Sequence, residues 1–242
     1  MKQGLMMMKK LILGTFLLFL LTGCLYPEQE RLENQVSYEN QILAVQQAVV
    51  QYRLENQVLP IHQERTDSTK IQQNLIDFQK LVPMYLQQPP GNSFENGGFY
   101  QYVLIDVEVD PQVKLIDLAM TREIQEFQRS INEYRRKNRF APVQEIVAEG
   151  VFLLDHEKLR LKKAPTVNSP FHPDHRLPLL MDGDGIVIVD YTISLNDALN
   201  QFEHGLVHGD DIRELLVTHY PFVPAYSVPY TIKDGKAVFS SE

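Results

Sequence analysis

The chain has 242 residues, a formal net charge of −8 at pH 7 and a single cysteine. This length suffices for one large domain or two small ones, each with a sizeable core. The acidic balance opposes binding to nucleic acid through charge, so no nucleic-acid partner is expected. A single cysteine also excludes a disulfide framework within the chain.

Residues 1–23 have the layout of a secretory signal peptide. A short basic stretch ends in Lys9 and Lys10, and an apolar run follows over residues 11–21. A helix of that length is roughly 16 Å long, about half the hydrocarbon thickness of a bilayer, so a permanent span is not expected. Met8 is an alternative initiator to the first residue.

The apolar run ends in Leu21, Thr22, Gly23 and Cys24. This stretch resembles the lipobox of bacterial lipoproteins. The resemblance implies cleavage between Gly23 and Cys24 and attachment of diacylglycerol to the cysteine sulfur. It also implies a lipid anchor in the cell membrane, with the body of the protein facing outside the cytoplasm. An ordinary secretory signal, or a buried helix with an incidental cysteine, is the alternative.

Residues 24–40 are polar and charged, and we interpret them as a tether between the anchor and the body. The alternative is a lead-in turn of the first helix.

The body contains an internal repeat. "ILAVQQAVVQYRLENQVLP" at 42–60 aligns with "IQEFQRSINEYRRKNRFAP" at 124–142, and "LIDFQKL" at 75–81 is similar to "LLDHEKL" at 153–159. Two matched blocks in the same order indicate duplication. The identical pairs in the longer block are Ile42/Ile124, Gln46/Gln128, Tyr52/Tyr134, Arg53/Arg135, Asn56/Asn138 and Pro60/Pro142.

The repeated residues have structural explanations. Apolar side chains step by three or four along both long segments, which predicts two amphipathic helices. Asn56 and Asn138 are expected to end them in a left-handed conformation, before a proline that prevents continuation. Asp77 and Asp155 are expected to begin turns or helices, with an acid/base pair as the alternative. Thr121 and Ser194 are predicted N-caps of later helices.

Each helix is followed by predicted antiparallel strands. Residues 99–109 and 111–120 form one pair, and the stretches "LPLLM" and "IVIVDYTI" flank "DGDG" at 182–185. This last sequence predicts a hairpin turn, with a calcium loop as the alternative. The predicted fold is α+β. It has tandem helix-plus-antiparallel-sheet units at 41–120 and 121–194, and a helical and extended cap at 195–242.

The order of elements resembles the head domain of type IV pilins and pseudopilins, over roughly 42–109 and, more weakly, 124–190. The hydrophobic N-terminal helix of pilins is absent and a lipobox stands in its place, so filament assembly is not implied. The whole chain resembles an uncharacterised lipoprotein family of Gram-positive bacilli.

Histidines supply the candidate metal ligands. His204 and His208 are four residues apart, a spacing that can place both on one helix face, and His172 and His175 form a second pair. Glycines interrupt the first pair, and Asp210 is the expected cap of the helix after it. A solvated loop is therefore the favoured interpretation, and no cofactor is expected.

The tail "YPFVPAYSVPY" alternates prolines with apolar and aromatic residues. Phe222, Tyr226 and Tyr230 are candidate contacts for a protein partner, with capping of an open sheet edge as the alternative.

The chain lacks the common hydrolase, phosphate-loop and dinucleotide motifs. We therefore expect a non-catalytic binding or assembly module of the cell envelope with an envelope protein as a possible partner. A substrate-binding lipoprotein of an import system is the second hypothesis, and an envelope hydrolase is the third.

Overall fold

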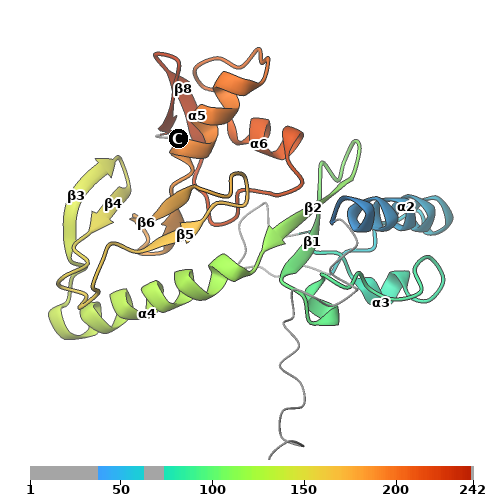
Figure 1. The fold of residues 1–242 in the computed structure, drawn as a ribbon, viewed down its shortest axis with the longest axis horizontal. Helices are drawn as coiled ribbons and strands as arrows, with labels where there is room; N and C mark the ends of the chain where they lie inside the picture. Colours follow the sequence, from blue (N-terminus) through green and yellow to red (C-terminus); the bar gives the residue numbers. More distant parts are fainter. Residues whose placement is uncertain (1–37, 63–73, 241–242) are drawn as a thin grey trace, which may run out of the picture. The chain divides into compact units, whose positions relative to one another are not determined.

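The computed structural model describes residues 38–62 and 74–240 and shows a mixed α+β fold (Figure 1). The predicted signal peptide, the Gly23–Cys24 cleavage site and residues 24–37 of the predicted tether lie outside these ranges. Within them, no helix has both the length and the apolar character needed to cross a bilayer.

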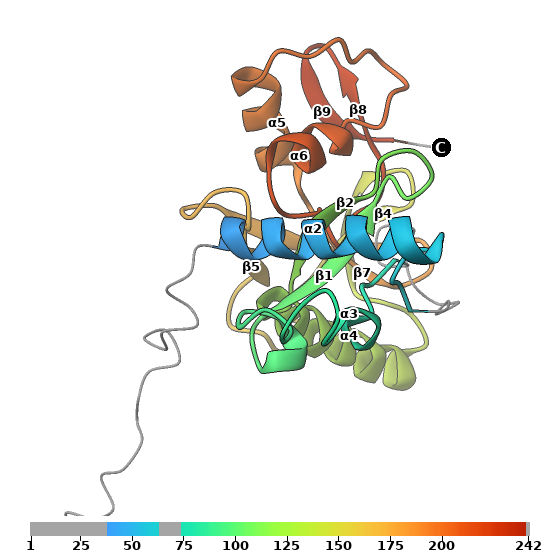
Figure 2. The same cartoon turned by 90° about the vertical axis from the view of Figure 1, so that its right-hand side faces the viewer.

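The first unit consists of a long helix and an antiparallel hairpin. Helix α2 (Tyr38–Asn56) lies against the hairpin of β1 (Tyr100–Ile105) and β2 (Gln112–Asp117), as Figure 2 shows. Short helices α3 (Phe78–Leu81) and η4 (Phe94–Asn96) occupy the connection between α2 and the hairpin. Helix α2 begins three residues before the predicted start of this unit, so the predicted tether is shorter than 24–40.

The second unit repeats this order with a larger sheet. Helix α4 (Ala119–Asn138) packs against β5 and β7 (Figure 1). The sheet order is β3-β4-β6-β5, with β7 also paired to β6, and each pairing is antiparallel. Its strands are β3 (Val143–Ala148), β4 (Val151–Leu154), β5 (Thr166–Asn168), β6 (Arg176–Asp182) and β7 (Val187–Val189).

The turn between β6 and β7 confirms the predicted hairpin at 182–185. Asp182 Oδ1 accepts hydrogen bonds from the backbone N–H groups of Asp184 (3.0 Å) and Ile186 (2.8 Å). Gly185 has φ of 86°, a left-handed conformation that favours glycine. The Asp182 side chain therefore stabilises the turn through these two hydrogen bonds.

The C-terminal part contains two helices and a further hairpin. Helices α5 (Thr192–Gln201) and α6 (Arg213–His219) precede β8 (Tyr230–Lys233) and β9 (Lys236–Phe239), which pair antiparallel. The predicted cap is helical and extended, and the structure shows that part of its extended segment is a hairpin. Gly235, at φ of 73°, provides the tight turn that the sequence interpretation overlooked.

The repeated glutamines link each long helix to a hairpin. Gln46 Nε2 donates to the Pro111 carbonyl at 2.9 Å, and its Oε1 accepts from the Val113 N–H at 2.7 Å. Gln128 makes the same two bonds, at 2.9 and 2.7 Å, to Gly185 and Val187. The two hairpins therefore occupy equivalent places against their helices.

The other repeated residues also make equivalent bonds. The N–H of Asp77 donates to the Pro60 carbonyl and that of Asp155 to the Pro142 carbonyl, both at 2.8 Å. Both aspartates then accept from the N–H two residues later, at 3.1 Å, which confirms them as turn and helix-start residues. The glutamine, aspartate and proline pairs that match in the sequence thus make matching hydrogen bonds.

A weaker third version of this link occurs in the C-terminal part. Asn196 on α5 accepts from the N–H of Ala237 on β9 at 2.9 Å, as Gln46 and Gln128 do from the second strands of their hairpins. Leu195, one residue earlier, is fully buried.

Two predicted helix C-terminal ends need correction. The left-handed residues are Gln57 (φ 59°) and Arg139 (φ 71°), one position after the asparagines. Asn56 and Asn138 are still helical, and each donates its side-chain N–H to the carbonyl four residues earlier, at 3.0 Å. The short amide side chain therefore adds a hydrogen bond to a carbonyl near the end of each helix.

The predicted N-caps lie inside their helices. Helix α4 begins two residues before Thr121, and helix α5 begins two residues before Ser194. Aspartates bind the first backbone N–H groups of these helices instead. Asp117 accepts from the Ala119 N–H at 2.7 Å, and Asp190 accepts from the Thr192 N–H at 2.8 Å. A carboxylate at the end of the preceding strand thus receives the first-turn donors.

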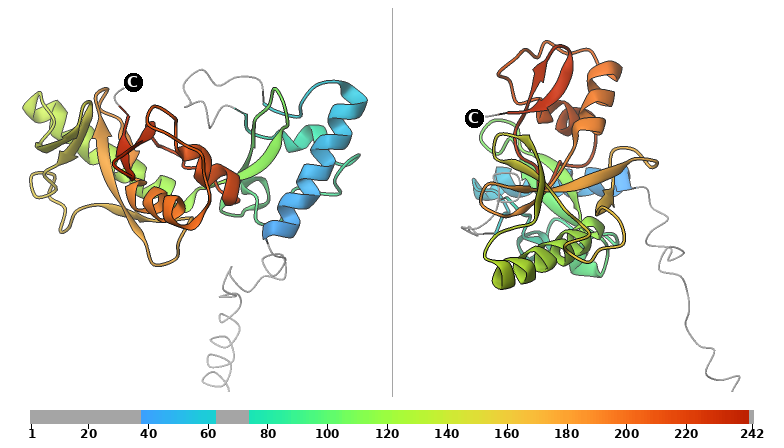
Figure 3. Two further views of the ribbon diagram at one scale, coloured as in Figure 1. Left: turned by 90° about the horizontal axis from the view of Figure 1, so that it is seen from above. Right: turned by 90° about the vertical axis from the view of Figure 1, so that its left-hand side faces the viewer.

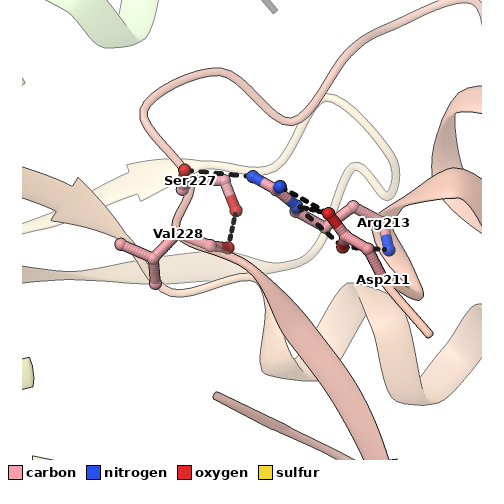
Figure 4. Close-up of polar contacts among 4 residues, drawn as sticks. All are labelled: Asp211, Arg213, Ser227 and Val228. Atoms are coloured by element: carbon pink, nitrogen blue, oxygen red, sulfur yellow. Dashed lines mark hydrogen bonds and ion pairs between the residues drawn. The ribbon is translucent and has the colours of Figure 1, made fainter. Parts of the chain in front are cut away.

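An ion pair fixes the return from α6 to β8 (Figure 4). The Arg213 guanidinium bonds both carboxylate oxygens of Asp211, and its Nη1 donates to the Ser227 carbonyl at 3.1 Å. Burial alone raises the pKa of Asp211, but the bonds from Arg213 outweigh it and hold this pKa below its usual range. Asp211, and not the predicted Asp210, therefore caps α6, accepting from the Arg213 N–H at 3.2 Å.

Candidate functional site

A hollow of about 440 Å³ lies beside α5, and we call it the α5 hollow. Three segments meet there, although the sequence separates them widely. The loop between β5 and β6 contributes Phe171, His172 and His175, and Tyr220 follows α6. Helix α5 contributes Ser194, Asp197, Asn200 and Gln201, which lie three or four residues apart or adjacent and so share one side of the helix.

The two histidines of the loop are stacked on each other. Their ring centroids are 4.1 Å apart and the rings are 21° from parallel. His172 Nδ1 accepts from the Asp174 N–H at 3.2 Å. His175 Nδ1 is buried and lies 3.3 Å from Asp197 Oδ2, without the alignment of a hydrogen bond. A small rotation of the half-exposed Asp197 would complete that bond.

One serine, Ser194, lines the α5 hollow and lies next to a second buried serine, Ser169. Ser194 Oγ lies 3.2 Å from Ser169 Oγ, and both residues are buried. Ser169 Oγ also accepts from the Phe171 N–H at 3.1 Å, which holds the loop in its turn. Among the described residues, neither hydroxyl bonds to a histidine, so the arrangement is not a Ser-His-Asp triad.

Aromatic rings form one wall. Phe171 and Tyr220 meet edge to face with centroids 5.3 Å apart, and Phe202 contacts Tyr220 at 5.8 Å. Partial burial, followed by the nearby charge of Asp197, raises the pKa of the Tyr220 hydroxyl. This hydroxyl therefore stays protonated and is a hydrogen-bond donor at neutral pH.

The lining decides which ligands suit the α5 hollow. It contains no lysine or arginine and includes one carboxylate, so an anion has no fixed charge to pair with. The serine, amide, imidazole and phenol groups disfavour a wholly apolar ligand, because these groups would lose their water without replacement. A neutral ligand with many hydroxyl or amide groups and one flat apolar side fits best.

The predicted metal ligands are not brought together. His204 and His208 are exposed in the non-helical connection between α5 and α6, so they do not share a helix face. Gly209, at φ of 100°, belongs to this connection, and Asp210 accepts from the Val207 N–H within it. The part of the chain that the structure describes has no group of three His, Cys, Asp or Glu residues arranged to hold a metal ion.

The predicted partner-binding residues are mostly core. Phe222 is 7 % exposed and Tyr230 is fully buried, so neither is available to a partner, and this prediction is wrong for both. Phe222 pairs with Leu115 of β2, so the tail covers an edge of the first hairpin, which was the alternative (Figure 3, left). Tyr226 is partly exposed, and its hydroxyl donates to Thr121 Oγ1 at 3.4 Å.

Sequence reasoning missed most of the α5 hollow. The sequence indicates His172 and His175 as candidate ligands and Ser194 as a cap, whereas Asp197 and Tyr220 join the site only in the structure. The spacing of Ser194, Asp197 and Gln201 along α5 was the available signal, since polar residues at helical spacing can line one face.

In a comparison with known protein families, residues 38–117 match the YphF family N-terminal domain. These residues run from the first residue of α2 to the last residue of β2. The chain is similar to this family over its first helix-plus-hairpin unit. That unit is about a third of the chain, and the α5 hollow lies outside it. No curated protein and no solved structure matches the chain.

Proposed function

We propose that the protein is a lipid-anchored, non-catalytic binding module of the cell envelope, facing outside the cytoplasm. The lipobox-like stretch ending in Cys24 supports the anchor, and the α5 hollow supports the binding role. The observation that carries the proposal is the convergence of three distant segments on one polar hollow with an aromatic wall. The proposed ligand is neutral and hydroxyl-rich, such as a glycan unit of the envelope.

The two other hypotheses receive less support. Substrate-binding proteins of import systems are usually built from doubly wound lobes with parallel strands, whereas the strand pairs in the described residues are antiparallel. A hydrolase would need an activated nucleophile, and the Ser194 hydroxyl faces another serine. The resemblance to pilin heads stays a prediction about fold.

The anchor is tested by labelling cells with an alkyne analogue of palmitate. We expect the wild-type chain to take up the label and to be digested by protease added to intact cells from which the wall has been removed. Cys24→Ser should lose the label. Label retained by this variant, or full protection of the wild type from the protease, would exclude the proposed anchor or its orientation.

The ligand is tested by titrating purified full chain with short neutral oligosaccharides, including oligomers of N-acetylglucosamine, and recording the melting temperature. A bound ligand stabilises the folded state, so the melting temperature rises with its concentration. Asp197→Asn should reduce the rise, because the carboxylate is an acceptor in the hollow. Asp174→Asn is the matched control, since it makes the same substitution on the β5–β6 loop, at a residue outside the lining. An equal rise in both variants would place binding elsewhere.

A further inference from the structure

A second hollow, of about 360 Å³, lies beside the last turns of α4, and we call it the α4 hollow. The chain returns to this place after β4, so the segment around residues 158–160 lies next to the end of the helix (Figure 1). Its lining includes Ser130, Glu133 and Tyr134 from α4, and the cations Lys137, Lys158 and Arg160.

Positive charge is concentrated here although the chain as a whole is acidic. Segments 135–139 and 158–163 each contribute four cations and no carboxylate, so they hold eight of the 23 lysines and arginines. The chain carries a net charge of −8. The two segments are separated in the sequence, and the return of the chain after β4 brings Lys137, Lys158 and Arg160 into the lining of one hollow.

Most of these cations are not neutralised by the protein. Lys158 pairs with Asp155 at 3.1 Å, and Glu133 is the one carboxylate of the lining. In the described ranges, Lys137 and Arg160 take part in no ion pair and are exposed. A helix end explains one or two cations, because its carbonyls carry partial negative charge. It does not explain the cations on the returning segment.

The backbone at Arg160 supplies a further observation. Its φ is 61°, a left-handed conformation that costs an arginine roughly 1 kcal/mol and that glycine or asparagine would adopt more easily. In this conformation the arginine lines the hollow beside Lys137. The Tyr134 hydroxyl from the same wall adds a neutral donor.

We propose that the α4 hollow binds a phosphate or phosphodiester group of an anionic envelope component. Guanidinium and ammonium groups are the usual donors to phosphate oxygens, and a forked arginine contact adds geometric fit. The site is separate from the α5 hollow, which has no lysine or arginine in its lining. Phosphate chemistry occurs in soluble polymers and in lipid headgroups, and the experiment below separates these sources.

The test is binding of the purified full chain to two probes, a short glycerol-phosphate oligomer in solution and vesicles containing phosphatidylglycerol. The double variant K137Q/R160Q removes two cations of the hollow. The control K233Q/K236Q removes two exposed lysines of the β8–β9 hairpin, so both variants have the same net charge. Melting temperatures confirm that both are folded.

We expect K137Q/R160Q to lose at least about tenfold in affinity for one or both probes, and the control to lose less than about twofold. Loss confined to the oligomer assigns the site to a polymer, and loss confined to vesicles assigns it to lipid headgroups. Equal losses in the two variants would show that overall charge, and not the hollow, determines binding. That result, or no binding of either probe by the wild type, would overturn the proposal. Neither result depends on the α5 hollow or its ligand.

Discussion

At the scale of single residues, the fold depends on side chains that complete the hydrogen bonding of distant backbone. Gln46 and Gln128 each bond one carbonyl and one N–H of a hairpin, and both glutamines are partly buried. A buried backbone group left without a partner costs free energy because water cannot replace the lost bond. The identity of this pair in the two repeats therefore has a physical reason.

Gln128→Ala is expected to lower the free energy of unfolding by about 1–3 kcal/mol, because Gly185 and Val187 lose their partners. Urea denaturation followed by circular dichroism measures the change. Gln125→Ala is the control, since this side chain is exposed on the same helix and makes no bond in the described part of the chain. Equal effects of the two variants would contradict the structural role.

At the scale of elements, each long helix ends in the same way. The helix continues through the repeated asparagine, one residue then adopts a left-handed conformation, and a proline follows. In the second unit the left-handed residue is Arg139, at φ of 71°. A β-carbon is unfavourable there, since it crowds the neighbouring carbonyl.

Arg139→Gly is expected to raise the free energy of unfolding by about 1 kcal/mol, because glycine adopts this conformation without strain. Arg136→Gly, three residues earlier inside α4, should lower it by about 1 kcal/mol, because glycine is unfavourable within a helix. The two melting temperatures should therefore move in opposite directions. A fall in both would mean that the arginine side chain, and not the backbone, dominates at position 139.

At the scale of the described body, residues 38–62 and 74–240, the C-terminal part connects the units. Phe222 pairs with Leu115 of β2, and its ring contacts those of Tyr38 and Tyr100, with centroids 5.9 and 5.6 Å away. The Leu115 N–H donates to the Pro221 carbonyl at 2.9 Å. The tail is thus part of the first unit's packing, although it is more than 100 residues away in the sequence.

Phe222→Ala is expected to lower the free energy of unfolding by about 3–5 kcal/mol, because it leaves a cavity between the tail and the first unit. Wild type should unfold in one transition by both far- and near-ultraviolet circular dichroism. Phe94→Ala, at a side chain that is 60 % exposed, should change the stability by less than about 0.5 kcal/mol. Two separate transitions in the wild type would show that the units fold independently.

The sequence by itself determined the repeat, the two long helices, the turn at 182–185 and the roles of Asp77 and Asp155, because these depend on local periodicity and on neighbouring backbone. It did not predict strands β3, β4 and β5 or the β8–β9 hairpin. The pairing of β4 and β5 with β6 depends on how the chain returns.

Both hollows are formed only by the tertiary structure, which brings together residues that are distant in the sequence. The α5 hollow needs a loop, one helix face and Tyr220, and the α4 hollow needs two basic segments about 20 residues apart. Charge and hydrogen-bonding groups act through distance in space, and folding sets those distances. The lipobox-like stretch at Cys24 is local and was identified from sequence, whereas the groups proposed to bind ligands were brought together by packing.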